Sequence, residues 1–340
     1  MVLEHLFPDS WLEKKFSLSF FMGAGFSIIG IILARLLFGS NSGLASVIFT
    51  SLLIIPSLYK LFKEEEKIEL KEKKFSFKEL YKDNKNLIHA YLGIFAGVFV
   101  AYYMIAFLSA YFGWNTVNIF REQLFLDPAI MGRAAYSFPT FWSILANNWW
   151  VLLATFMLSL LSGNGAVFFV VWNASAWAAI FGLRAIAAGA VLGKSPFAIG
   201  AIMQLITLPH ILLEGGSYIL AGIAGAMISR DIVSESKEMG KFMGIFAMIL
   251  VGFYVMNMFF KIIANGPFLI IIRMLLVLGL VYVLKNAFLD KKHKEVFVYN
   301  YWLFIVALGV FILGALVETG VLSWSDTLNL YYSASAAYFG

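Results

Sequence analysis

Two ionisable side chains, His210 and Glu214, lie inside one of the longest apolar stretches of the chain. Residues four apart share one face of a helix, so the imidazole and the carboxyl group are expected side by side. Ionisable groups inside a bilayer are costly and therefore mark candidate functional sites. Three uses are open for this pair: hydrogen bonds that hold helices together, binding of a proton or an ion, and acid–base catalysis or metal binding.

The residues around this pair predict a break in the helix that carries it. Pro209 lacks a backbone N–H, and Gly215 and Gly216 allow close approach of another backbone. One imidazole and one carboxylate are too few ligands to assign a metal, and the sequence contains no His-Glu-x-x-His motif of the zinc proteases. We therefore predict no catalytic residue and no cofactor, and the sequence leaves the question of a metal open.

Several further polar residues lie in or at the ends of apolar stretches. Each could make one hydrogen bond between helices. Under the topology derived below they fall mostly in the outer half of the membrane, so a water-filled pocket open to the outside would also account for them. Two arginines are candidate ion-pair partners of the glutamate in this set, and the sequence does not choose between them. The set is Asn147, Asn148, Asn173, Glu318, Arg184 and Arg273.

The composition predicts that these residues are positioned by helices in a lipid bilayer. Hydrophobic residues make up 61% of the 340 residues and charged residues 13%, whereas soluble domains usually carry about 25% charged residues. The net charge of +5 does not indicate nucleic-acid binding, because the lysines gather in two short segments between apolar runs. The chain has no cysteine, which excludes disulfides, thiolate metal sites and cysteine nucleophiles.

A crossing of the bilayer needs about 20 mostly apolar residues, and nine stretches meet this requirement. We therefore predict an all-α, polytopic bundle of about nine spans. The sixth stretch is long for one crossing, so it is expected to be tilted, broken or partly re-entrant. The nine stretches are 16–38, 43–62, 87–112, 140–161, 165–188, 196–229, 240–263, 267–288 and 297–318.

Lysine placement predicts the orientation of these spans. The segments 60–85 and 285–294 are rich in lysine and should face the cytoplasm. Nine crossings then put the N-terminus inside and the C-terminus outside a cell membrane. The first apolar run, Phe16–Phe38, is longer than the h-region of a signal peptide and is expected to stay as an anchor. Segment 113–139 would lie outside and could form an amphipathic helix at the headgroups.

Small residues predict where helices approach closely. Gly93 and Gly97 form a G-x-x-x-G pattern, and a second stripe of alanine and glycine covers 221–226. Both favour tight helix contacts, within one chain or between copies. The sequence Gly163-Asn164-Gly165 predicts a tight turn between the fourth and fifth spans.

The order of these motifs resembles the stage II sporulation protein M family. Asn147-Asn148 begins a span, the glycine turn at 163–165 follows, and Asn173 lies in the next span. Then come the Pro-His-x-x-x-Glu element at 209–214 and, late in the chain, Glu318-Thr319, where the family has a Glu-x-x-x-Thr-type helix end. Ile211 stands where the family often has glycine, and Gly215-Gly216-Ser217 replaces a second proline.

The resemblance implies a polytopic membrane protein that anchors and organises partners in a complex that remodels the cell envelope, without being a hydrolase itself. It covers roughly residues 87–260 and the last span. We accordingly divide the chain into a two-span module at 1–86, a core at 87–263, and two further spans with an outer tail at 264–340. The expected partners are the lipid bilayer and other membrane proteins or a second copy. The alternatives are a transporter or channel that uses the His/Glu pair, as broken membrane helices do, and an intramembrane hydrolase.

Overall fold

The computed structural model describes residues 16–39, 42–69, 77–114, 119–120, 123, 138–233, 271–272, 274–275, 278–279 and 291–339. Within these residues the chain is helical and contains no strand, which confirms the predicted all-α fold. The helices are α2 (Phe16–Phe38), α3 (Gly43–Glu69), α4 (Phe77–Tyr111), α6 (Phe138–Ser162), α7 (Ala166–Leu192), α8 (Pro196–Val233), α11 (Lys291–Trp324) and α12 (Asp326–Phe339).

Six of these helices are long and apolar enough to cross a membrane. They correspond to the first, third, fourth, fifth, sixth and ninth predicted spans, so a multi-pass helical membrane protein is confirmed and nine spans are not. The second predicted span is present as a shorter apolar helix, Gly43–Tyr59, at the start of α3. The predicted spans 240–263 and 267–288 lie outside the described residues, apart from a few positions between 271 and 279.

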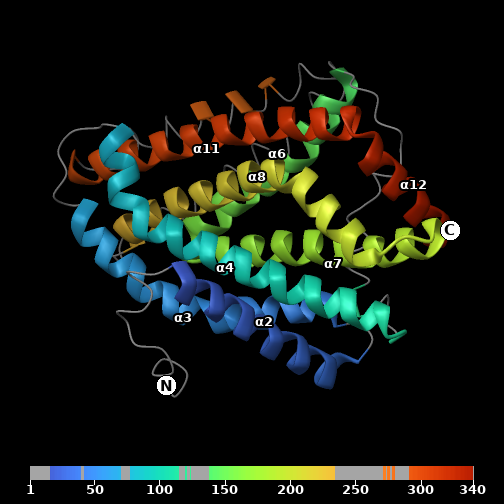
Figure 1. Ribbon diagram of the computed structural model, residues 1–340. Coiled ribbons are helices and arrows are strands. Elements are labelled where there is room, and N and C mark those ends of the chain that lie inside the picture. The colour runs from blue at the N-terminus through green and yellow to red at the C-terminus, as the bar shows by residue number, and fades with distance from the viewer. Residues whose placement is uncertain are drawn as a thin grey trace.

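The helices form one bundle in which α7 and α8 are central (Figure 1). Helices α2, α3 and α4 pack together on one side, and α11 runs along the opposite side against α8. Between these two sides, α4 packs on α7, α7 on α8, and α6 on α8. The short last helix, α12, lies against α7.

The sixth predicted span is one continuous helix, α8, of 38 residues. Such a helix is about 57 Å long at 1.5 Å per residue, so it exceeds a hydrocarbon core of about 30 Å and must tilt or bend. It passes through Pro209 and through both glycines of the predicted break without interruption, and it changes direction along its length (Figure 1). A proline inside a helix is a usual cause of such a bend. The prediction of a long helix is confirmed, and α8 is neither broken nor re-entrant in its described part.

Helix α8 has an inner and an outer face. Leu205, Leu208 and Leu212 are exposed at spacings of three and four residues, as expected for a side that faces lipid. His210 and Glu214 are offset from Leu208 and Leu212 by two residues and are both buried. The ionisable pair therefore points into the bundle and away from the acyl chains.

The G-x-x-x-G pattern of α4 is an intramolecular contact with α2. A Cβ atom added at Gly93 would lie 2.7 Å from the carbonyl oxygen of Phe16, and one at Gly97 would overlap the carbonyl oxygen of Phe20. The contact is reciprocal, since a Cβ at Gly23 of α2 would lie 2.6 Å from the carbonyl oxygen of Ile94. Without side chains at these positions the two backbones touch directly, so the predicted tight packing is confirmed within one chain.

The second small-residue stripe serves the other half of the bundle. A Cβ atom at Gly222 of α8 would overlap the side chain of Ala166 at the start of α7, and one at Gly225 would overlap the carbonyl oxygen of Phe156 in α6. Helices α6 and α7 meet at the predicted turn, where Gly163 has φ +71°. This left-handed conformation favours glycine, and the turn brings both helices onto the small face of α8.

The chain ends differ from the sequence-based boundaries. Helix α11 continues past the predicted end at residue 318 to Trp324, and the outward tail predicted for 319–340 contains α12. Ser325 separates the two helices and its Oγ accepts a hydrogen bond from the backbone N–H of Leu328 at 3.1 Å, as a helix N-cap does. In segment 113–139 only residues 113–114, 119–120, 123 and 138–139 are described. Of these, Phe120 is buried against Tyr102.

Candidate intramembrane polar site

The polar site in the bundle is centred on Glu214 and on Tyr218, one helical turn further along α8. The Tyr218 hydroxyl donates a hydrogen bond of 2.6 Å to Glu214 Oε1. Both side chains are buried, with 5% of Glu214 and 1% of Tyr218 exposed. The sequence-based prediction missed Tyr218, although its spacing of four from Glu214 in an apolar stretch is the signal that identifies it.

Helix α11 contributes the second carboxyl group of the site. Glycine 314 brings its backbone against α8, because a Cβ atom there would lie 3.3 Å from the backbone nitrogen of Glu214. Glu318 follows Gly314 by four residues and so lies on the same face of α11. The carboxyl groups of Glu318 and Glu214 are close enough to interact electrostatically, and Glu318 also acts on the Tyr218 hydroxyl. The structure therefore places two carboxyl groups and one phenol at the α8–α11 interface.

Two polar atoms near this cluster have no hydrogen-bond partner in the described part of the protein. They are Nδ1 of His210 and Oε2 of Glu318, and both atoms are buried. His210 is 7% exposed. The side-chain donor to Glu214 is Tyr218 and not His210. Buried polar atoms are usually satisfied, so each exception needs a physical reason.

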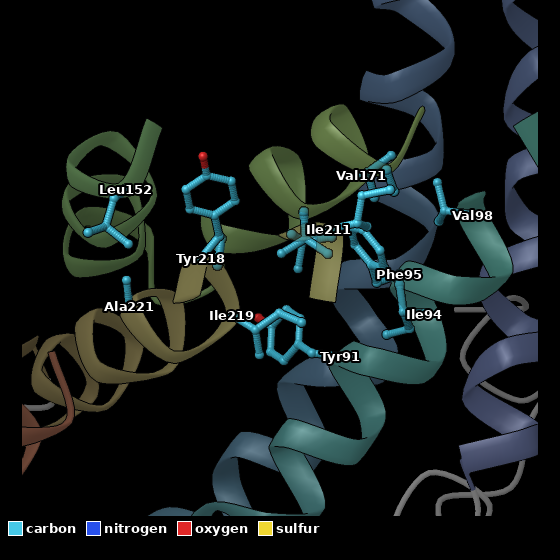
Figure 2. Close-up of a cluster of buried hydrophobic side chains, with 14 of the residues drawn as sticks. Tyr91, Ile94, Phe95, Val98, Leu152, Val171, Ile211, Tyr218, Ile219 and Ala221 are labelled. Carbon is cyan, nitrogen blue, oxygen red and sulfur yellow. The ribbon is translucent and has the colours of Figure 1, made fainter. Parts of the chain in front are cut away.

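Tyr218 belongs to a cluster of buried hydrophobic side chains to which α4, α6, α7 and α8 contribute (Figure 2). Ile211, Tyr218 and Ile219 of α8 lie in this cluster, with Leu152 of α6 on one side and Tyr91 and Phe95 of α4 on the other. Gly215 faces α4, since a Cβ atom there would lie 3.3 Å from the ring of Phe95. An apolar surrounding has a low dielectric constant, which strengthens the interactions between the polar groups it encloses.

Gly216, the other glycine of the predicted break, faces open space, because no atom lies within 4 Å of a Cβ added there. Ser217, the next residue, donates from Oγ to the Glu214 carbonyl oxygen at 2.6 Å. A serine that bonds back to its own helix in this way favours a local bend. Neither residue adds a chemical group to the cluster.

The asparagines of the sequence-based site make their hydrogen bonds on their own helices. Asn147 is exposed and donates to the side-chain oxygen of Asn148 at 3.1 Å, within α6. Asn173 donates to the backbone carbonyl of Phe169, one turn earlier in α7, at 2.7 Å. No hydrogen bond joins these three residues to the α8–α11 cluster, within the ranges that the structure describes. A pocket that unites all the predicted polar residues stays a prediction.

Arg184, the first candidate partner of Glu318, is buried in α7 and contacts the C-terminal helix. Its Nη1 donates to Ser335 Oγ at 2.8 Å, and its guanidinium lies 4.7 Å from the ring centroid of Tyr332. Both partners belong to α12, so this arginine fixes α12 to α7. The other candidate, Arg273, lies outside the described residues.

The chemical capacity of the site follows from these groups. Among the described side chains, no group of three or more histidine, cysteine, aspartate or glutamate residues has the arrangement of a metal site. Two carboxyl groups and a phenol at a helix interface can exchange protons and accept or donate hydrogen bonds. The site therefore provides a hydrogen bond within α8, an electrostatic interaction between the carboxyl groups of α8 and α11, and a place where a proton could reside.

Fold and site together define a multi-pass helical membrane protein with a buried acidic cluster. Comparisons of the chain with models of known protein families, with curated proteins and with solved structures gave no match. The resemblance to the stage II sporulation protein M family therefore stays a prediction that rests on the order of the motifs. The division at residues 86 and 263 and the orientation in the membrane also stay predictions.

Proposed function

We propose that this chain is a non-enzymatic membrane scaffold, a component of a membrane complex that remodels the cell envelope. One observation supports this function: Arg184, a buried group that could do chemistry, makes a contact that holds two helices together, and the hydrogen bond of Glu214 lies within its own helix. Glu214 accepts from Tyr218 beside α11, and Arg184 fixes α12. The order of motifs that resembles the sporulation protein M family supplies the envelope role.

The surface of the bundle suits a protein that binds others within the membrane. Large apolar side chains are exposed along α2 and α8, and such surfaces face either lipid or the helices of a partner. The small residues at 93, 97, 222 and 225 pack inside the chain, so partners would bind through larger apolar side chains. The exposed large apolar residues of α2 and α8 are Phe16, Phe21, Ile28, Ile29, Ile32, Leu33, Leu36, Leu37, Phe38, Phe197, Ile202, Leu205, Leu208 and Leu212.

The test replaces the gene in the source cells by Glu214→Ala, with Leu212→Ala as the matched control on the lipid-facing side of the same helix. Membranes are cross-linked, and the complex that contains the chain is sized and identified by mass spectrometry. Glu214→Ala should lower the abundance of the chain or its share in the complex, and the envelope should change as in a deletion strain. Leu212→Ala should leave both readouts unchanged.

Two results would contradict the scaffold function. One is a Glu214→Ala chain with normal abundance and normal assembly that nevertheless loses its envelope phenotype, because the carboxyl group would then act chemically. The other is a chain that cross-links to no membrane protein and no second copy in cells where its deletion changes the envelope.

A second function, proton- or ion-coupled transport, is favoured by one specific observation: two carboxyl groups meet in the interior beside a bent helix. Transporters often place their coupling sites in such surroundings. Purified chain in lipid vesicles should then carry a proton or solute flux that Glu214→Gln abolishes. Absence of flux across cations, anions and small neutral solutes would rule this function out.

A further inference from the structure

Glu214 and Glu318 come from different helices, and both carboxyl groups lie at one interface in the membrane-spanning part of the bundle. Glu214 Oε1 already accepts a hydrogen bond from Tyr218. Glu318 Oε2 is buried without a partner among the described residues. A carboxylate oxygen can only accept, whereas the same oxygen with a proton can also donate. One proton on the pair would give the buried oxygen of Glu318 a donor function.

The electrostatics of the site favour this proton. An apolar interior excludes the water that would screen two negative charges. Their repulsion therefore grows as the local dielectric constant falls. Two carboxyl groups that share one buried site therefore do not both ionise. The aspartic proteases show the same physics with two carboxyl groups that share one proton.

Among the residues that the structure describes, no cationic side chain is shown in contact with the two carboxyl groups. On α8 the surrounding titratable groups are His210, whose Nδ1 has no partner, and Tyr218, which donates to Glu214. Helix α6 has none, and α7 has only Arg184, which contacts α12. The remaining described candidates on the helices that pack against α8 are the following: Tyr81, Lys82, Lys85, His89, Tyr91, Tyr102, Tyr103 and Tyr111 of α4, Tyr299 and Tyr301 of α11, Asp326, Tyr331 and Tyr332 of α12, and Tyr59 of α3.

We propose that Glu214, Glu318 and Tyr218 form an intramembrane proton-binding site, in which the two carboxyl groups share one proton and the Tyr218 hydroxyl donates to the Glu214 side of the pair. The unpartnered imidazole of His210, one turn before Glu214 on the buried face of α8, is a second observation that points to a ligand at this place. The ligand is a proton rather than a metal ion, because the described residues offer no set of three metal-binding side chains.

This site links the packing of α8 on α11 to the proton. With one proton the pair carries a single negative charge, which the Tyr218 hydroxyl stabilises. Loss of that proton leaves two negative charges on facing helices, only one turn from the close approach at Gly314. The α8–α11 contact therefore weakens when the site is emptied. This inference goes beyond the scaffold function and does not depend on it.

The experiment uses the purified full-length chain in vesicles of neutral lipid, in D2O, and infrared spectroscopy of the carbonyl stretch. A protonated carboxyl group absorbs apart from carboxylates and amides. The wild-type chain should show this band at neutral pH and lose it at strongly alkaline pH. Glu214→Gln with Glu318→Gln should remove the band, and each single variant should change its frequency. Asp326→Asn, which replaces an exposed carboxyl group at the start of α12, should leave it unchanged.

Three results would overturn the proposal. The first is a folded wild-type chain without the band at neutral pH, and the second is a band that persists in the double variant. The third is a band that disappears when sodium or potassium ions are added at constant pH, because the site would then bind a metal cation. Tyr218→Phe guards against a misfolded double variant, since it keeps the carboxyl groups and should shift the band through loss of the donor. The cross-linking experiment measures assembly, whereas the infrared experiment measures protonation. The scaffold proposal and the proton-site proposal can therefore fail independently.

Discussion

The α2–α4 interface and the α8–α11 interface solve the same problem of joining two helices in lipid with opposite means. Between α2 and α4, glycines at 23, 93 and 97 bring the backbones into direct contact. Between α8 and α11, one glycine at 314 allows approach, and a cluster of Glu214, Tyr218 and Glu318 lies beside it. Lipid tails are as apolar as leucine, so helices in a membrane associate through close packing and through polar contacts rather than by hydrophobic burial.

This difference indicates that the packing of α2 on α4 is insensitive to pH, whereas the packing of α8 on α11 can change with pH. A glycine contact depends on shape alone and has no group that titrates. A carboxyl cluster depends on its protonation and on hydrogen bonds that can be exchanged. The four predictions below test this contrast, beginning with the interface that depends on shape.

The largest effect is expected from Gly97→Val in α4. The new side chain would overlap the Phe20 carbonyl oxygen, which belongs to the backbone of α2 and cannot rotate away. Overpacking a tight contact typically costs about 1–3 kcal/mol and sometimes more, and we expect the upper end of this range, with reduced abundance. Thermal unfolding in detergent measures the loss. Gly25→Val is the matched control, because nothing lies within 4 Å of a Cβ there. Equal melting of both variants would contradict the close contact.

A smaller effect is expected from Tyr218→Phe, which removes only the hydroxyl. The aromatic ring keeps its place in the buried cluster, and Glu214 Oε1 loses its donor. Hydrogen bonds between membrane-embedded side chains contribute about 0.6 kcal/mol on average and about 1.7 at most. The loss of stability should lie in this range. Tyr331→Phe is a control on α12, and an unchanged melting curve for Tyr218→Phe would contradict the role of the hydrogen bond.

The α8–α11 interface should tolerate Gly314→Ala better than the α2–α4 interface tolerates Gly97→Val. A Cβ there would lie 3.3 Å from the backbone nitrogen of Glu214 and 3.4 Å from the Leu213 side chain, so a shift of a few tenths of an ångström suffices. A helical alanine also gains about 1 kcal/mol over glycine in helix propensity. We expect a net change below about 1 kcal/mol by thermal unfolding. A loss as large as that of Gly97→Val would remove the contrast between the interfaces.

The smallest effect is expected from Asn173→Ala. The Asn173 amide bonds to the Phe169 carbonyl oxygen, which already serves as an acceptor within α7. Loss of such a local bond changes stability by less than about 0.5 kcal/mol, as for substitutions away from critical contacts. Asn173→Leu, measured in parallel, keeps the size of the side chain and removes its amide, so it separates the effect of size from the effect of polarity. A large loss of stability or of assembly in Asn173→Ala would instead support the shared pocket that the sequence suggested.

Much of the fold could be predicted because lipid imposes strong rules on sequence. The all-helical class followed from the apolar composition, the turn at Gly163 from its flanking glycines, and the tight α4 contact from the spacing of Gly93 and Gly97. The sequence left the sixth span tilted, broken or re-entrant around Pro209 and the glycine pair, and α8 is continuous through all three residues, with Gly215 packed on Phe95 and Gly216 facing open space. Helix α11 continues through residues 319–324, and no residue near 318 predicts this continuation.

The candidate site could be predicted only along one helix. The spacing of His210 and Glu214 identified the inner face of α8, and the structure buries both. The meeting of Glu318 with Glu214 depends on the register of α11 against α8. Packing between helices about 100 residues apart in the sequence sets this register, so a local pattern does not reveal it. Tyr218 was missed because a tyrosine in an apolar run resembles a core residue until its acceptor is known. Charge alone made Arg184 one of two candidate partners of Glu318, and the structure shows its guanidinium in contact with α12.

The contact between Arg184 and α12 has a consequence for how the chain matures. Residue 184 is synthesised well before residues 326–339, so the guanidinium is already in its helix when Ser335 and Tyr332 do not yet exist. Until then its charge has to be hydrated or held by other groups near the ends of neighbouring segments. Docking of α12 on α7 is therefore a late event of biogenesis, because it has to await the synthesis of residues 326–339.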